Sequence, residues 1–417
     1  MSQPRGSIEA GEFAATVKQR RRVGARWRVI FQVSTIFGIV VLTALLFNIL
    51  NQSFGLAAVE FAIEPASLAQ NGVPLEELNR DQLTAIFQAN VSPGLYRRYD
   101  SERPFAERTR VEVYELVMER VVEPTVVKTW SLYDTLLKRP AIEAEQAEKY
   151  PGARLQFFSW LSPEFVVKPQ SSEPLRAGVR TAILGSLWTI AITIVFAFPI
   201  GVGAAICLEE YAGDTGLNRL IQTNINNLAG VPSIIYGILG LAIFVRGLEP
   251  LTSGEVFGYG EDSTTANGRT ILSAGLTLGL LILPLIIINA REAIRAVPAS
   301  LRRASFGLGA TRWQTVWSHV LPSAIPGILT GTILAISRAI GETAPLVVVG
   351  ASTFVTFDPD GPFSKFTTLP IQIYQWTARP QAEFRNIAAA AILVLLLLLL
   401  TLNAGAVVLR NRYRIRF

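Results

Sequence analysis

The sequence has very little of the residue types that most enzymes and metalloproteins use for chemistry. It contains one cysteine and one histidine in 417 residues. The lone cysteine, Cys207, excludes an intrachain disulfide, and the lone histidine, His319, excludes a multi-histidine metal site. No glycine–lysine dipeptide occurs, so the sequence has no phosphate-binding Walker loop. No nucleophile–base pair or metal constellation is visible either. We therefore predict a chain without catalytic residues, metal or bound cofactor, which does not itself hydrolyse ATP.

Charged residues are also scarce, and their scarcity points to a membrane protein. They form 17% of the chain, against 50% apolar residues, whereas a soluble domain carries about 25% charged residues. A helix needs about 18–20 apolar residues to cross a bilayer. Six charge-free segments reach or approach that length: 29–50, 181–208, 220–245, 270–290, 320–337 and 386–409. Buried helices of a soluble protein are the alternative, but those are seldom apolar on every face. We predict an all-α polytopic membrane protein with six transmembrane helices.

The distribution of arginine and lysine predicts the topology. These residues concentrate in an N-terminal arm (1–28), in the loop 291–322 and in a C-terminal tail (410–417). Short cytoplasmic loops carry an excess of Lys and Arg, so both termini and the loop 291–322 are expected in the cytoplasm. The arm contains Arg5, Lys18, Arg20, Arg21, Arg22, Arg26 and Arg28, and the tail contains Arg410, Arg412, Arg414 and Arg416. Both clusters adjoin predicted spans, which disfavours a nucleic-acid partner.

The segment 51–180 differs from the rest of the chain because it is rich in Glu, Arg and Pro. We predict a mostly helical, extracytoplasmic insert between the first span and a core of five spans (181–409). Helices are expected over 74–90, with Pro74 at the first helical position, and over 110–122 and 141–150. A structural cap or spacer is the main alternative to a functional domain, since no site chemistry is visible in this segment.

The loop 291–322 reads REAIRAVPASLRRASFGLGATRWQTVWSHVLP. Pro298 can begin a helix that runs through Leu308, and Gly309 can end it, because glycine accepts left-handed dihedrals. Thr311 and Gln314 have the spacing of a capping box for a second helix. That helix carries an apolar stripe formed by Trp313, Val316, Trp317 and Val320. Such a helix–glycine–helix unit suits docking to a protein, and an amphipathic helix lying on lipid is the alternative.

Two spans contain polar residues that are costly inside a membrane. Arg338 and Glu342 are spaced i, i+4 in the fifth span, so they share one helix face. Such a pair can lock helices together, or it can belong to a transport pathway, where Arg binds phosphate oxygens; both roles remain open. Pro345 predicts a kink beside the pair. In the third span, Asn227 and Ser233 favour close helix packing over a pathway role.

The loop 291–322 resembles the cytoplasmic coupling loop of binding-protein-dependent ABC transporter permeases. The family pattern there is Glu-Ala-Ala, three residues, Gly, nine residues, Ile, one residue and Leu-Pro. The matching residues are Ala304, Gly309, Leu321 and Pro322, whereas Arg303, Ser305 and His319 stand in place of the expected Glu, Ala and Ile.

Four further motifs resemble the A-type permease subunit of the phosphate ABC importer. They are LEEYA (208–212), NLAGVPSIIYGILGLAIFV (227–245), RAIGETAP (338–345) and LPIQIYQW (369–376). The resemblance covers roughly residues 175–412 and implies a type I importer permease fold in a bacterial inner membrane. It implies four partners besides lipid: a C-type permease in a heterodimer, an ATPase dimer, an extracytoplasmic phosphate-binding protein and inorganic phosphate.

The resemblance also implies which residues carry these functions. The expected pathway residues are Arg338, Glu342, Thr343, Asn227 and Ser233. The expected ATPase-coupling residues are Arg303, Ala304, Gly309, Trp313, His319, Leu321 and Pro322. Two alternatives remain: a permease for another oxyanion such as sulfate or molybdate, and a membrane-anchored sensor or scaffold that acts through residues 51–180.

Overall fold

The computed structural model describes residues 10–70, 72–259, 267–351 and 354–412. Arg5, Arg414 and Arg416, which we predict to be cytoplasmic, lie outside these ranges. The chain divides into two compact units, Met1–Asn51 and Gln52–Phe417. The first unit is one long helix, α1 (Ala10–Ser53). Its apolar part confirms the first predicted span as a helix. The helix also continues through the basic residues from Lys18 to Arg28, which the sequence analysis treats as a separate arm.

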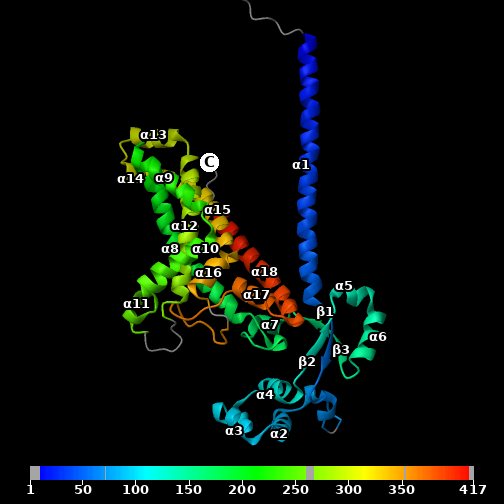
Figure 1. Ribbon diagram of the computed structural model, residues 1–417. Coiled ribbons are helices and arrows are strands. Elements are labelled where there is room, and N and C mark those ends of the chain that lie inside the picture. The colour runs from blue at the N-terminus through cyan, green and yellow to red at the C-terminus, as the bar shows by residue number, and fades with distance from the viewer. Residues whose placement is uncertain (1–9, 71, 260–266, 352–353, 413–417) are drawn as a thin grey trace, which may run out of the picture. The chain divides into compact units, whose positions relative to one another are not determined.

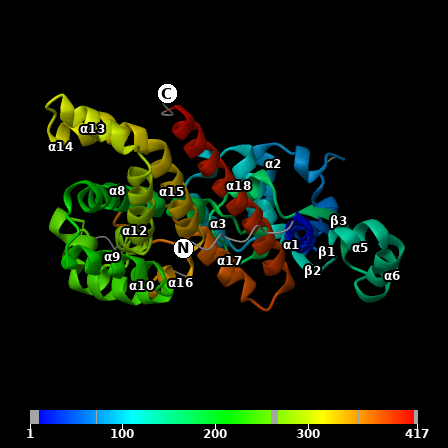
Figure 2. The same cartoon turned by 90° about the horizontal axis from the view of Figure 1, so that it is seen from above.

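In the second unit, four long helices form the apolar core (Figure 1). They are α8 (Arg180–Ile206), α12 (Ile271–Arg295), α15 (Leu321–Gly341) and α18 (Ala382–Arg412). Seen from above, α12 lies between α8 and α15, and α18 lies beside α15 (Figure 2). All four are long and apolar enough to span a membrane. They confirm the second, fourth, fifth and sixth predicted spans as helices.

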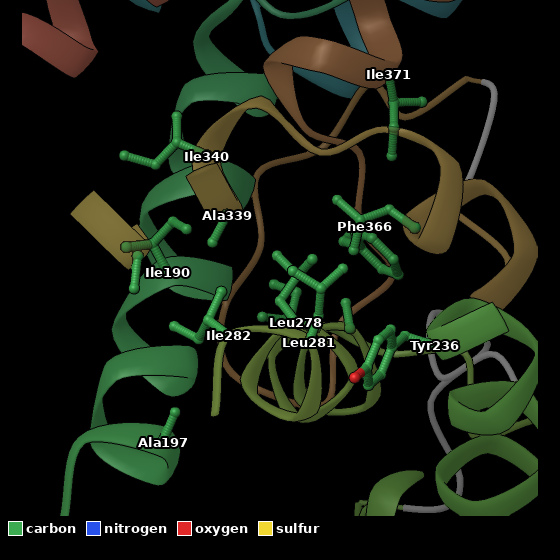
Figure 3. Packing of buried hydrophobic residues seen from close by; sticks show 14 of the residues in the cluster. Ile190, Ala197, Tyr236, Leu278, Leu281, Ile282, Ala339, Ile340, Phe366 and Ile371 are labelled. Atoms are coloured by element: carbon green, nitrogen blue, oxygen red, sulfur yellow. The ribbon is translucent and has the colours of Figure 1, made fainter. Parts of the chain in front are cut away.

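Interdigitated aliphatic side chains hold these helices together. Leu278, Leu281 and Ile282 of α12 point into the space between α8 and α15 (Figure 3). They contact one cluster with Ile190, Ala197, Tyr236, Ala339, Ile340, Phe366 and Ile371. Close helix approach depends on small residues: a Cβ at Gly275 would lie 2.6 Å from a methyl group of Ile192. The core therefore fixes where the ends of α8, α12 and α15 lie.

The third predicted span, 220–245, is not one straight helix. It consists of α9 (Gly216–Ala229) and α10 (Ser233–Gly240), and the chain bends by 104° between them. Pro232 cannot donate a backbone hydrogen bond at the break. The carbonyl of Leu228 instead accepts from the Tyr236 hydroxyl over 2.8 Å and from the Val231 N–H over 3.1 Å. Within the described residues there are thus five candidate spans, or six if this bent pair counts as one.

The fifth span also stops where the sequence predicts a kink. Helix α15 ends at Gly341, and α16 (Ala344–Val349) begins after Glu342 and Thr343. Pro345 is the second residue of α16, where its missing N–H costs nothing. The other short helices of this core are α11 (Glu249–Thr252), α13 (Ala299–Gly307), α14 (Arg312–Thr315) and α17 (Leu369–Thr377).

The insert contains a sheet that the sequence analysis does not predict. Strand β1 (Phe54–Glu60) lies between β2 (Thr125–Thr129) and β3 (Arg154–Ser159), and both pairings are antiparallel. The three strands are far apart in the sequence and only five to seven residues long, so local periodicity gives little sign of them.

Helices cover the remainder of the insert. They are α2 (Arg80–Asn90), α3 (Pro93–Glu102), α4 (Arg110–Val117), α5 (Leu132–Leu137), α6 (Arg139–Lys149) and α7 (Pro163–Val167). The predicted helix from Pro74 actually begins at Arg80, because Asn79 and Gln82 form a reciprocal capping box there. The predictions over 110–122 and 141–150 agree with α4, which a π-helical turn extends to Val122, and with α6.

Candidate functional site: a docking segment and a charged helix end

The segment 291–322 folds as the sequence predicts, as two short helices around a glycine. Helix α13 follows Pro298, and Gly309 adopts a φ of +82°, which a residue with a Cβ rarely does. The capping box of Thr311 and Gln314 is complete and begins α14. A buried hydrogen bond of 2.8 Å between the hydroxyls of Ser305 and Thr315 joins the two helices. The unit is therefore a defined hairpin.

The hairpin exposes an aromatic and aliphatic surface. Trp313 and Trp317 are each 59% exposed, and their rings stack with centroids 5.5 Å apart. Leu308, at the turn, is 90% exposed. The predicted four-residue stripe is wrong in one respect: Val316 and Val320 are buried in the core, so the tryptophans form an outward face of their own.

The other predicted coupling residues surround this surface. Arg303, Ala304, Gly309 and His319 are exposed, whereas Leu321 and Pro322 are half-buried at the start of α15. A π-helical turn (Val316–Val320) runs directly into α15. The exposed hairpin and the fifth span therefore form one nearly continuous helical element, so a force on the tryptophan surface would reach α15 through the backbone.

Arg302 ties the hairpin to two other helix ends. Its guanidinium donates to Glu210 through Nη2 (2.6 Å) and Nε (3.0 Å). It also donates to the carbonyls of Val297 (2.7 Å) and Ile294 (2.9 Å), which lie at the end of α12. Glu210 belongs to a π-helical turn (Cys207–Tyr211) that ends α8. One largely buried side chain thus joins α13, α12 and α8.

A second ion pair reinforces the same junction. Arg295 donates to both oxygens of Glu209 at 2.9 and 3.0 Å, and Arg291 approaches Glu209 at 3.4 Å. Glu209 and Glu210 are not among the functional residues predicted from the sequence. The available signal is two carboxylates at the end of an apolar span together with arginines in the loop 291–322, whose opposite charges meet only in the folded chain.

The predicted contact between Arg338 and Glu342 is present, at 3.3 Å from Nε to Oε1. Arg338 lies in the last turn of α15, and Glu342 is the residue that caps it. The Arg338 side chain is 43% exposed and that of Glu342 is 18% exposed. Within the described ranges, the hydrogen bond of the Arg338 guanidinium to Glu342 uses Nε and leaves the two Nη groups without an acceptor.

The breaks in two spans lie near this pair. Helix α10 packs against α16 so closely that a Cβ at Gly237 would lie 2.7 Å from Cα of Pro345. Thr343 lies in the second break and is half-buried. The structure therefore brings the interrupted part of the third span next to the interrupted part of the fifth.

The two predicted pathway residues of the third span occupy opposite sides of its bend. Asn227 is exposed near the end of α9, and Ser233 is half-buried at the start of α10. Their role remains a prediction. In the described ranges, no group of three or more His, Cys, Asp or Glu side chains could hold a metal ion.

Comparison with known proteins gives the following similarities. Residues 197–415 match the model of a family described as "Binding-protein-dependent transport system inner membrane component". The chain is 34% identical over 219 residues to the "Probable ABC transporter permease protein YqgI" of Bacillus subtilis (strain 168), which covers 52% of this chain and 68% of the relative. It is 32% identical over 240 residues to the "Phosphate transport system permease protein PstA 1" of Mycobacterium tuberculosis (strain ATCC 25618 / H37Rv). The aligned region covers 57% of this chain and 71% of that relative.

One solved structure, "Inward facing conformations of the MetNI methionine ABC transporter", is similar in fold. The match covers 59% of this chain and 100% of the chain in that structure. It is 20% identical, with a TM-score of 0.43.

Proposed function

The chain belongs to the family of binding-protein-dependent transport system inner membrane components, and we propose that it is the permease subunit through which such an importer moves inorganic phosphate. It is a multi-pass inner-membrane protein and an ABC importer permease subunit, hence a transport component and not an ATPase. ATP hydrolysis belongs to a separate subunit. A second permease and a substrate-binding protein complete an importer of this kind.

The identity of the substrate is the finer part of the proposal. The names of several relatives support phosphate, among them the mycobacterial PstA 1 and the PstA of Mycobacterium leprae, which is 34% identical over 223 residues. Other relatives are named only as permeases. The chemistry of one side chain, Arg338, supports phosphate in addition to these names.

Arg338 has the properties that an anion-binding group needs. Its side chain is 43% exposed beside two helix breaks, and its contact with Glu342 uses only Nε. The free Nη edge can donate two parallel hydrogen bonds to two oxygens of one phosphate, which lysine cannot do. The exposed Arg338 guanidinium at the interrupted end of α15 is the observation that carries the proposal.

Glu342 can distinguish phosphate from other oxyanions. An ionised carboxylate only accepts hydrogen bonds. Near neutral pH phosphate still carries at least one P–OH group that can donate to it, whereas sulfate and molybdate are fully ionised and would only be repelled. We infer that Arg338 attracts the anion and that Glu342 selects the protonated one. Thr343, Asn227 and Ser233 are proposed to line the same passage.

The hairpin 299–320 is proposed to dock on the ATPase. Trp313, Trp317 and Leu308 supply an exposed apolar surface suited to a groove, with Arg303 and His319 at its edge for acidic or polar groups of the partner. Aromatic residues and arginine dominate the energetics of protein interfaces. If the ATPase moves the hairpin, the Arg302–Glu210 and Arg295–Glu209 pairs would transmit that movement to α8 and α12.

The direction of the chain in the membrane is also a proposal. The hairpin and the insert lie at opposite ends of α8, α12, α15 and α18 (Figure 1). If the hairpin meets a cytoplasmic ATPase, the insert faces the exterior and the substrate-binding protein. The excess of Lys and Arg near both chain ends supports cytoplasmic termini.

Transport by the complete assembly tests the substrate. Vesicles that contain this chain, its partner permease, the ATPase and the binding protein should take up radiolabelled phosphate when ATP is supplied. A large excess of unlabelled phosphate should strongly reduce the signal, and the same excess of sulfate or molybdate should leave it unchanged. Equal competition by sulfate would show that the chain is a permease for oxyanions in general. Full uptake without residues 51–180, combined with loss of a phosphate response in cells, would favour a sensor role for the insert.

A further inference from the structure

Helix α5 of the insert carries large apolar side chains that are exposed in the described part of the chain. Leu136 and Leu137 are 71% and 65% exposed, and Tyr133 lies one turn earlier with about half its surface exposed. Thr135, by contrast, is buried. Exposed apolar residues are common singly, but a contiguous group marks a surface that meets a partner or a membrane.

Hydrogen bonds fix α5 close to the point where the chain leaves its first apolar helix. The Leu56 N–H donates to the Thr135 hydroxyl over 2.9 Å, and the Trp130 N–H donates to the Leu56 carbonyl over 2.8 Å. Leu56 is the third residue of β1, and β1 follows directly on Ser53, the last residue of α1. Three strand residues extend about 10 Å. Chain connectivity alone thus keeps α5 near a membrane surface.

Contacts of the sheet within the second unit lead to the same position. Val126 of β2 and Phe158 of β3 pack against a cluster that contains Trp376 of α17 and Phe384 of α18. Figure 1 draws α5 level with α17 and with the beginning of α18, whereas α2, α3 and α4 lie farther from the spans. The sheet therefore lies at the ends of the spans, and α5 packs against its central strand, β1.

The polar residues around α5 suit a lipid headgroup region. Lys138 pairs with Asp134 at 2.8 Å and lies 5.9 Å from the centre of the Tyr133 ring. Tyrosine is enriched at membrane interfaces, and lysine keeps its charge in water while its stem covers apolar surface. Arg139, the next cation, pairs with Glu143 at 3.0 Å. Because these charges are internally paired, the surface does not require anionic lipid.

We propose that α5 lies in the membrane interface on the side of the insert, with Leu136 and Leu137 at the boundary between headgroups and acyl chains. Interfacial helices are buried about 5–10 Å in that region. This contact would anchor the sheet side of the insert to the bilayer. It depends on the membrane location of the chain and not on the identity of the transported anion.

Fluorescence quenching in the complete assembly tests this contact. The single cysteine, Cys207, is exposed, so we would replace it by serine and introduce Leu136→Cys for labelling with an environment-sensitive NBD dye. In phosphatidylcholine liposomes, a nitroxide near the headgroup end of the lipid chain should quench this dye more than one near the chain end. Aqueous iodide should quench it weakly. Val111→Cys on α4, 58% exposed in the structure, is the matched control and should show strong iodide quenching and little lipid quenching.

Two results would overturn the proposal. Strong iodide quenching at position 136, equal to that at position 111, would place α5 in water. Protection from both iodide and lipid nitroxides would show that a protein covers α5, either the binding protein or the partner permease. Leu137→Cys serves as an independent second site, since its side chain is also exposed and its replacement leaves no cavity.

Discussion

Breaking the Arg302–Glu210 pair should uncouple ATP hydrolysis from transport. The two side chains are 19% and 10% exposed, so the pair lies between the surface and buried cases. Surface pairs contribute about 0–1 kcal/mol, and breaking a fully buried pair costs about 3–5 kcal/mol. We expect a coupling free energy of roughly 2 kcal/mol for this pair, which is about a thirtyfold effect on the equilibrium between folded and unfolded protein.

A double-mutant cycle measures this value. The free energy of unfolding in mixed micelles would be determined for Arg302→Ala, Glu210→Ala and the double variant. Arg302→Ala should be the more destabilising single change, because it also removes the bonds to the carbonyls of Val297 and Ile294. In liposomes, each single variant should hydrolyse ATP with less substrate moved per ATP.

The exposed pair Arg139–Glu143 provides the control. Its side chains are 70% and 55% exposed in an i, i+4 arrangement, and the same cycle should give about 0.3–0.5 kcal/mol. Additive effects at Arg302 and Glu210, within about 0.5 kcal/mol, together with normal transport per ATP, would refute the reasoning. The Arg302–Glu210 pair would then have no role in coupling ATP hydrolysis to transport.

Two further predictions concern docking and topology. Gly309→Ala forces a Cβ onto a residue with a φ of +82°, at a cost of roughly 1–2 kcal/mol. This cost shifts the equilibrium away from the native turn by about 5–30-fold, so ATPase stimulation should fall while membrane insertion persists. Gly307→Ala is the control, since Gly307 is helical and has open space around its Cβ position; equal loss in both variants would argue against a specific turn. A reporter that is active only outside the cytoplasm should work when inserted beside Gln146 and fail beside Gln314. The reverse pattern would invert the proposed orientation.

The hairpin 299–320 could be predicted from the sequence because its signals are local. Pro298, Gly309 and the Thr311–Gln314 capping box each act within a few residues, and all three have their expected structural effect. The four long spans were predictable for the same reason, because length and apolar composition suffice.

Features that depend on distant residues were not predictable. Arg295 and Glu209 are 86 positions apart, and no periodicity links them before folding. The three strands of the insert come from segments separated by tens of residues, so only the folded chain brings Leu56 opposite Phe157. The third span contains Gly230 and Pro232, which suggest a weak point, but the bend of 104° depends on packing against α16 and α12.

Replacing the charged pair of α15 by leucines tests the central claim most directly. The variant Arg338→Leu/Glu342→Leu keeps the volume and removes both charges together. The Arg338 side chain is 43% exposed, and a partly exposed ion pair contributes only about 0–1 kcal/mol to stability, so the exchange should cost little. If Arg338 binds the anion, the assembly should form in normal yield and show no phosphate uptake, and Arg338→Lys should retain partial uptake. Normal phosphate uptake by a well-assembled double-leucine variant would contradict the account and assign the pair to helix packing alone.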